Sequence, residues 1–213
     1  TLLYNARVNR VSMGVQTFDD ACLTFLSRRH TSRQAMEAVA TLREAGIGNV
    51  SIDLMFGFPG ETLEQWHRDI DAALALGVEH ISAYSLAYEE GTTLRRMLDD
   101  GEVGEAEEEV CRSMYYDLVD QLTAAGYEHY EISNFARQGF RSRHNSSYWD
   151  GTHYLGLGAG AHSYNGATRQ WNVADVKAYV EAVEAGQPND GDETIDSRTA
   201  YNDMITTGLR TAE

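Results

Sequence analysis

Residues 49–77, NVSIDLMFGFPGETLEQWHRDIDAALALG, decide the fold class. The run from 49 to 57 is mostly apolar and partly β-branched, which predicts a buried strand. After a glycine- and proline-containing turn, Thr62 and Gln65 form the T-x-x-Q capping box of a helix, and Gly77 ends it at the C′ position. The apolar face of this helix is formed by Leu63, Trp66, Ile70 and Leu74. A buried strand followed by a capped helix is the repeating unit of an α/β protein.

The same unit recurs on both sides of this segment. Residues 10–16 (RVSMGVQ) predict an earlier strand, and residues 31–46 predict a helix whose capping box is formed by Thr31 and Gln34. Residues 79–86 (EHISAYSL) predict a third strand. Strands that alternate with helices in this way predict a parallel sheet with right-handed crossovers.

The pattern changes after Gly126, where a helix preceded by the acidic run 102–110 ends. Residues 127–136 (YEHYEISNFA) predict one further strand. Residues 137–172 are rich in glycine, asparagine and aromatic residues without a helical period, and connections of this length are usually functional. An amphipathic helix is expected at 173–186, and the segment from 186 to 196 (GQPNDGDETID) is expected to be a polar loop.

Composition narrows the function classes. The 213 residues contain 17 Lys and Arg against 33 Asp and Glu, a net charge of −16, so nucleic acid is not expected as a general partner. No apolar run approaches the roughly 20 residues of a membrane span, and the first residues lack the apolar stretch of a signal peptide. Because the chain does not begin with Met, we expect a piece of a longer protein. Cys22 and Cys111 form neither a disulfide framework nor a metal knuckle, which favours the reducing cytoplasm.

Polar residues stand at the ends of the predicted strands. Gln16 ends the first strand, Asp53 interrupts the second, and Tyr84 and Ser85 lie near the end of the third. Ligands of α/β proteins bind at the carboxyl ends of parallel strands. A buried carboxylate is costly unless it is paired or hydrogen-bonded. Asp53 therefore indicates either a ligand site or a hydrogen bond to a neighbouring loop.

Six segments together carry a resemblance to a known family: GVQTFDDACLTFLSRRH (14–30), IDLMFGFPGET (52–62), HISAYSL (80–86), YEISNFA (130–136), HNSSYW (144–149) and GLGAGAHSY (156–164). The chain resembles the radical S-adenosylmethionine (SAM) family of oxygen-independent coproporphyrinogen III oxidases (dehydrogenases), and most closely its HemW-type heme chaperone subfamily. The resemblance implies an α/β fold, a partial (βα)6 barrel. Residues 1–126 would form about its second half, and residues 127–213 would begin a C-terminal α+β extension.

The resemblance implies a SAM site, lined by residues at positions that match the family pattern: Gln16, Arg28, Asp53, Ala87 and His162. Two alternatives stay open, because Arg28 could be a surface cation and His162 a hydrogen-bonded structural residue. The family also holds a [4Fe–4S] cluster on a C-x-x-x-C-x-x-C motif, since iron needs thiolate ligands. This motif does not occur in the sequence, so we expect no metal ligands here, and neither cluster assembly nor SAM cleavage by these residues alone.

The segment RSRHNSSYWDG (141–151) gathers basic and aromatic residues in an acidic chain. By resemblance, H-N-x-x-Y-W belongs to the heme chaperones and implies a heme site at His144, Asn145, Tyr148 and Trp149. Imidazole is a common axial ligand of heme iron, and aromatic rings offer flat faces to a porphyrin. The arginines expected to pair with the propionates are Arg137, Arg141 and Arg143. Alternatively, these arginines pair with acidic residues of the chain, and the aromatic residues fill a core.

The function implied by the resemblance is a heme-binding chaperone that delivers heme to apo-proteins. The alternative is an enzyme of porphyrin biosynthesis that oxidatively decarboxylates coproporphyrinogen III. A third hypothesis is an inert scaffold piece with no activity of its own. The expected ligand is heme or another porphyrin in the first two cases.

Overall fold

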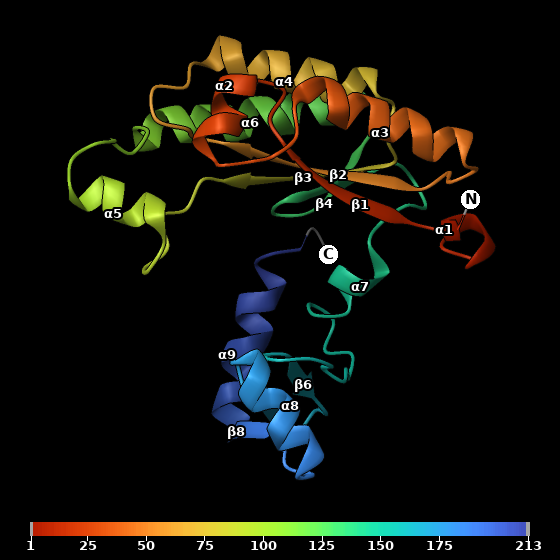
Figure 1. Cartoon of the computed structure of the whole chain (residues 1–213), viewed down its shortest axis with the longest axis vertical. Helices are drawn as coiled ribbons and strands as arrows, with labels where there is room; N and C mark the ends of the chain where they lie inside the picture. Colours follow the sequence, from red (N-terminus) through yellow and green to blue (C-terminus); the bar gives the residue numbers. More distant parts are fainter. Residues whose placement is uncertain (1, 212–213) are drawn as a thin grey trace. The chain divides into compact units, whose positions relative to one another are not determined.

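A computed structural model describes residues 2–211 of the chain (Figure 1). The chain divides into two compact units, Thr1–Arg141 and Ser142–Glu213. The division lies after Arg141 rather than after Gly126, where the sequence analysis places the domain boundary. The difference arises because residues 128–136 complete the sheet of the first unit.

The first unit contains a sheet with the strand order β1-β2-β3-β5-β4. As predicted, β1 (Val11–Gln16), β2 (Val50–Phe56) and β3 (His80–Ser85) are parallel to one another. The single strand expected at 127–136 is wrong, because this segment forms a hairpin of β4 (Glu128–Glu131) and β5 (Asn134–Ala136). The hairpin turn is held by the carboxylate of Glu131, which accepts hydrogen bonds from the backbone N–H of Ser133 and from the side-chain amide of Asn134.

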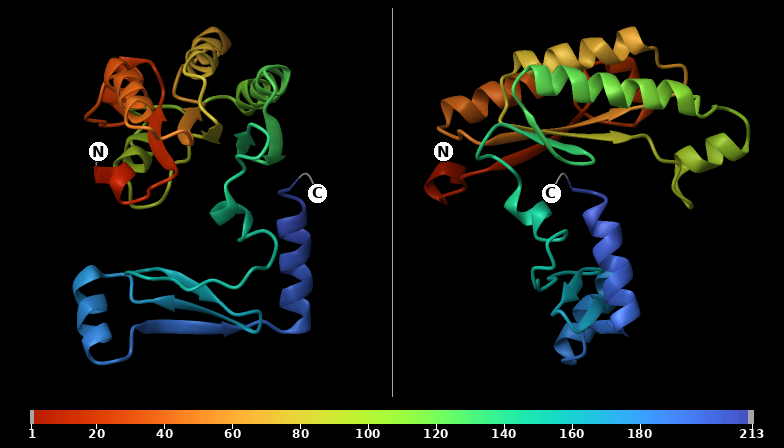
Figure 2. Two further views of the ribbon diagram at one scale, coloured as in Figure 1. Left: turned by 90° about the vertical axis from the view of Figure 1, so that its right-hand side faces the viewer. Right: turned by 180° about the vertical axis from the view of Figure 1, so that it is seen from behind.

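The long helices α3 (Ser32–Glu44), α4 (Leu63–Ala75) and α6 (Glu108–Ala124) cover one face of this sheet (Figures 1 and 2). Both predicted capping boxes are present, at Thr31 on α3 and at Thr62 on α4. Each threonine accepts from the backbone N–H three residues later, which satisfies a donor that a helix start leaves unpaired. The shorter helices of this unit are α1 (Leu2–Asn5), α2 (Asp20–Phe25) and α5 (Thr93–Asp99).

The core lies between these helices and the sheet. Trp66 of α4 is fully buried, packs against Phe56 of β2 and donates a hydrogen bond from Nε1 to the carbonyl of Met114, 2.9 Å away. Along β2, Val50, Ile52, Leu54 and Phe56 enter this core. Because side chains alternate along a strand, the intervening residues of β2 lie on the opposite face. Polar residues on that face, Asp53 among them, are therefore free to form a site.

The second unit is an antiparallel sheet with the order β6-β7-β8, flanked by helices. Its elements are α7 (Arg143–Ser146), β6 (His162–Tyr164), β7 (Thr168–Asn172), α8 (Val176–Glu184), β8 (Asn189–Thr194) and α9 (Ser197–Gly208). The helix expected at 173–186 is confirmed. The polar loop expected at 186–196 is wrong, because residues 189–194 form β8, which pairs with β7. In residues 2–211, no helix combines the length and apolar character needed to cross a membrane.

Candidate functional site

Gln16 and Asp53 lie on neighbouring parallel strands, Gln16 at the carboxyl end of β1 and Asp53 in the middle of β2. Gln16 is buried and adopts a left-handed backbone conformation with φ of 70°, where the pairing of β1 with β2 shifts register. Gly14 stands in register with Asp53, and a Cβ atom on Gly14 would lie 2.5 Å from Nε2 of Gln16. The side-chain amide of Gln16 therefore folds back over the glycine. This arrangement explains why residue 14 has no side chain.

Asp53 begins a row of polar residues across the sheet. It stands in register with Ser82 of β3, Ser82 with Asn134 of β5, and Asn134 with Glu131 of β4. Hydrogen bonds join the row, with Ser82 Oγ 2.7 Å from Asn134 Oδ1. Ser12 Oγ also donates to Asp53, over 3.4 Å. Burial raises the pKa of Asp53, while the hydrogen bonds from Ser82 and Ser12 oppose the shift. Asp53 is thus a desolvated but partnered carboxylate, suited to accept hydrogen bonds from a polar ligand.

These residues fit part of a SAM site. The Gln16 amide and the Asp53 carboxylate offer donors and acceptors from one face, on adjacent strands. Ala87 follows β3 and is exposed, and Arg28 follows α2 with an exposed side chain. His162 lies in the other unit, on β6, where its ring is exposed and 6.0 Å from the ring of Trp171. Their roles toward SAM remain predictions.

A second group of carboxylates, missed by the sequence analysis, surrounds a small cavity of about 140 Å³ beside α2 and α4. Glu61 accepts hydrogen bonds from the backbone N–H groups of Gly57 and Phe58, at 2.7 and 3.0 Å. Burial, with a smaller contribution from the nearby carboxylates Asp69 and Asp19, raises the pKa of Glu61 to about 7. Glu61 thus holds the turn of the GFPGE segment. Its only sequence signal is a glutamate directly after a glycine turn.

Cys22 lines the same cavity, and burial together with the neighbouring carboxylates raises the pKa of its thiol to about 11. A thiol that stays protonated is a poor nucleophile and a poor metal ligand. Within residues 2–211, no group of three or more His, Cys, Asp or Glu side chains is arranged to hold a metal ion.

The segment HNSSYW begins with the short helix α7. Ser142 caps it by accepting from the backbone N–H of Asn145, and the turn continues as Trp149 N–H donates to the carbonyl of Ser146. His144 and Tyr148 are four residues apart and therefore lie on one side of the turn. His144 Nε2 lies 3.1 Å from the hydroxyl oxygen of Tyr148, and the two rings meet edge to face.

The three predicted propionate-pairing arginines have different surroundings. Arg141 forms an ion pair with Glu128, with 3.0 Å between Nε and Oε2, and its guanidinium lies over the ring of Tyr130. Arg137 stacks over Tyr127 and donates to the carbonyl of Ala125. Both arginines belong to the first unit, whereas Arg143 lies in the second, is exposed, and has no ion pair to any of residues 2–211. Of the three cations, Arg143 is therefore the most available to pair with a ligand carboxylate.

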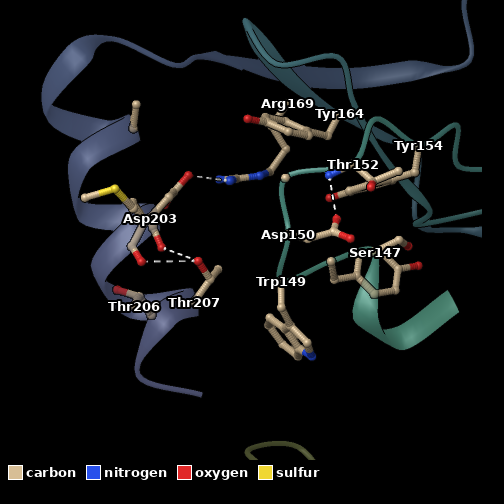
Figure 3. A pocket seen from close by; sticks show the side chains of 14 residues that line it. Ser147, Trp149, Asp150, Thr152, Tyr154, Tyr164, Arg169, Asp203, Thr206 and Thr207 are labelled. Carbon is tan, nitrogen blue, oxygen red and sulfur yellow. Dashed lines mark hydrogen bonds and ion pairs between the residues drawn. The ribbon is translucent and has the colours of Figure 1, made fainter. Parts of the chain in front are cut away.

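The second unit contains a cavity of about 540 Å³ (Figure 3). Residues after α7 form one wall, and residues of α9 form the opposite wall (Figure 3). Its aromatic lining is formed by Tyr148, Trp149, Tyr154 and Tyr164. Arg169 of β7 also lines it and bridges Glu193 of β8 and Asp203 of α9, at 2.9 and 2.8 Å.

The cavity joins residues that the sequence analysis predicted to others that it missed. Tyr148 and Trp149 were predicted to contact a porphyrin, and both line the cavity. Arg169, Asp203, Met204 and Thr207 were missed, because only the pairing of β7 with β8 and the packing of α9 bring them near residues 147–154. The indole Nε1 of Trp149 is buried and has no hydrogen-bond partner among residues 2–211. The volume and the aromatic walls of the cavity fit a flat ligand of cofactor size.

Comparison with known proteins gives a consistent result. The family model of the radical SAM superfamily matches residues 2–73. The chain is 39% identical over 210 residues to the heme chaperone HemW of Bacillus subtilis. The matched region covers 98% of this chain and 55% of that protein. It is 41% identical over 179 residues to HemW of Mycobacterium tuberculosis, covering 84% of this chain and 46% of the relative. The chain thus spans about half the length of the curated relatives that it matches.

The fold has a counterpart among solved structures. Coproporphyrinogen III oxidase (HemN) from Escherichia coli, a radical SAM enzyme, superposes with a TM-score of 0.81 at 20% identity. The match covers 99% of this chain and 52% of HemN, and at this identity it establishes the fold alone. The parallel strands, the helices on one face and the sequence relatives agree: over its whole length this chain matches about half of radical SAM proteins of the HemN and HemW type.

Proposed function

We propose that the chain is part of a heme-binding protein that delivers heme to apo-proteins. The observation that carries this proposal is the cavity of the second unit, where Tyr148 and Trp149 of the HNSSYW segment meet Tyr154 and Tyr164. The relatives named heme chaperone HemW, at 39 and 41% identity, support the same assignment. The cytoplasm is the compartment that fits the sequence.

The residues of this site suit a porphyrin. The rings of Tyr148 and Tyr154 pack edge to face, with centroids 4.9 Å apart, and provide a preorganised apolar wall. His144 and Tyr148 both carry atoms that can ligate iron. Among the predicted arginines, Arg143 is the best candidate to pair with a propionate, because Arg141 already pairs with Glu128. Asn145 contributes its backbone to the cap of α7, and its side chain remains a predicted contact.

SAM would be held in the first unit by Gln16 and Asp53 on the sheet, with Arg28 after α2 and Ala87 after β3 as further predicted contacts. His162, predicted for the same ligand from the sequence, lies in the second unit. In radical SAM proteins a [4Fe–4S] cluster supplies the electron that cleaves SAM, and Cys22 and Cys111 are too few to hold one. In this chain, Ser12 and Ser82 hydrogen-bond the Asp53 carboxylate and hold it in position to accept hydrogen bonds from a ligand.

The alternative is oxidative decarboxylation of coproporphyrinogen III; HemN, the structural neighbour, carries the name coproporphyrinogen III oxidase. The likeness to HemN rests on fold at 20% identity and does not extend to residue roles. The curated relatives at higher identity favour heme delivery.

The proposal is tested by titrating the 213-residue chain with hemin and following the Soret absorption. We expect saturable binding, and an increase of about 10-fold in Kd for Trp149→Ala, equal to about 1.4 kcal/mol. Tyr201→Ala is the matched control, because Tyr201 is an exposed aromatic residue of α9 that does not line the cavity. Binding that does not saturate, or an equal loss in both variants, would contradict the proposal.

A further inference from the structure

In the observed arrangement, the Nε2 atom of His144 is engaged by Tyr148 and does not face a ligand. The Nε2 atom of His144 and the hydroxyl of Tyr148 are hydrogen-bonded to each other over 3.1 Å. When Nδ1 carries the ring proton, Nε2 accepts the hydrogen bond that the phenol donates. The Nε2 lone pair is then engaged, whereas the phenol oxygen keeps lone pairs that can face a ligand.

The position of the two side chains relative to the cavity differs as well. Tyr148 lines the cavity of the second unit, and His144 is not among the described residues that line it. The ring of Tyr148 is held edge to face against Tyr154, which also lines the cavity. A molecule that enters the cavity therefore contacts Tyr148, whose hydroxyl lies 3.1 Å from Nε2 of His144.

Backbone hydrogen bonds fix the positions of His144 and Tyr148 relative to each other. Ser142 caps α7, Ser147 N–H donates to the carbonyl of Arg143, and Tyr148 N–H donates to the carbonyl of Asn145, so a hydrogen-bonded turn continues from α7 through Tyr148. Ser147 Oγ also donates to the carbonyl of His144, at 2.7 Å. These bonds keep residues 144 and 148 one turn apart, on the same side of the segment. The histidine–tyrosine pair is thus preformed by local structure.

We propose that Tyr148, rather than His144, ligates the iron of ferric heme, and that His144 is the positioning residue that accepts the phenol proton. The proposal rests on the heme-binding function proposed above. As the bond between iron and the Tyr148 oxygen forms, the O–H bond breaks and its proton moves to Nε2 of His144. The iron stays ferric, and the water or chloride bound to it leaves. Tyrosine is an established ligand of heme iron, and an imidazolium beside it stabilises the phenolate.

The same pair provides a route for release. Return of the proton from His144 to the phenol oxygen converts an anionic ligand into a neutral one and breaks the bond to iron. Neither an oxidant nor a reductant is required for this step. A ligand that can be protonated by its neighbour suits a protein that passes its cargo on.

The test is the absorption and electron paramagnetic resonance spectra of the 213-residue chain titrated with hemin. We expect the phenolate-to-iron charge-transfer band and a rhombic high-spin ferric signal in the wild type and in the control Tyr201→Phe. Tyr148→Phe is expected to lose both features. His144→Ala is expected to keep both, with an affinity reduced about 10-fold, as for other residues that support a metal ligand.

The outcomes separate this inference from the proposed function. A saturable wild-type complex without the phenolate band overturns the inference and leaves heme binding in place. An imidazole-type spectrum that His144→Ala abolishes and Tyr148→Phe retains also overturns the inference and leaves heme binding in place. It assigns the iron ligand to His144. Absence of saturable binding in the wild type overturns both proposals. The wild-type spectrum decides even if Tyr148→Phe fails to fold, which far-ultraviolet circular dichroism would reveal.

Discussion

Glu61 is a partly buried carboxyl group whose pKa is raised into the neutral range. Its pKa is raised from 4.5 to about 7 by burial, so the folded state binds the proton more tightly than the unfolded state. The stability that this proton confers is complete below pH 4.5 and is lost as the pH rises through about 7. The carboxylate nevertheless accepts two backbone N–H bonds at Gly57 and Phe58, which oppose the shift.

We predict that Glu61→Gln removes this pH dependence. The glutamine oxygen can still accept a backbone hydrogen bond, but the side chain does not titrate. From pH 5 to pH 8, the free energy of unfolding of the wild type should fall by about 1–2 kcal/mol relative to the variant, after discounting for partial solvent exposure. Urea denaturation at several pH values measures this difference. Glu64→Gln is the control, because Glu64 is exposed in the same region. A difference that stays constant with pH would refute the prediction.

Single residues also show what a sequence can and cannot predict. Thr31 and Thr62 were predicted as helix caps because a capping box depends only on residues three positions apart. The partners of Arg141 could not be predicted. Its ion pair with Glu128 forms only once β4 is placed in the sheet, and nothing in the local sequence signals that placement.

At the scale of elements, α3 allows a direct measurement of capping. We predict that Thr31→Ala lowers the free energy of unfolding by about 1 kcal/mol, because its hydroxyl accepts from the backbone N–H of Gln34 at the helix start. Thr41→Ala on the same helix is the control, since the Thr41 hydroxyl only donates to the carbonyl of Glu37 and alanine favours helix. Urea denaturation of both variants measures the effect. Equal stabilities would show that the cap contributes nothing.

The elements predicted from sequence are those with a strong local period. The parallel strands β1, β2 and β3 are apolar runs between helices, and all three are confirmed. β8 was predicted as a loop because NDGDET is polar and has no apolar alternation. In the structure, most of its residues are exposed. Its strand conformation depends on pairing with β7, including the ion pair of Arg169 with Glu193, whose residues are also in register. Tertiary pairing here overrides a loop-like composition.

At the scale of the whole molecule, the two predicted sites fall in different units. Gln16 and Asp53 lie in Thr1–Arg141, and the cavity residues Tyr148 and Trp149 lie in Ser142–Glu213. The sequence motifs identified both regions. They could not show that the cavity is completed by Arg169 and Asp203, because those contacts join segments far apart in the chain.

This division predicts where hemin stabilises the molecule. A ligand stabilises the part that binds it by about 2.7 kcal/mol when its concentration is 100 times Kd. Hydrogen exchange followed by mass spectrometry should therefore show hemin slowing amide exchange in residues 147–154 and 200–207, with β2 and β3 unchanged. Trp149→Ala at the same hemin concentration is the control and should show weaker protection. Protection of β2 and β3 equal to that of the cavity segments would refute a site confined to the second unit, and would require the first unit to contribute residues to heme binding.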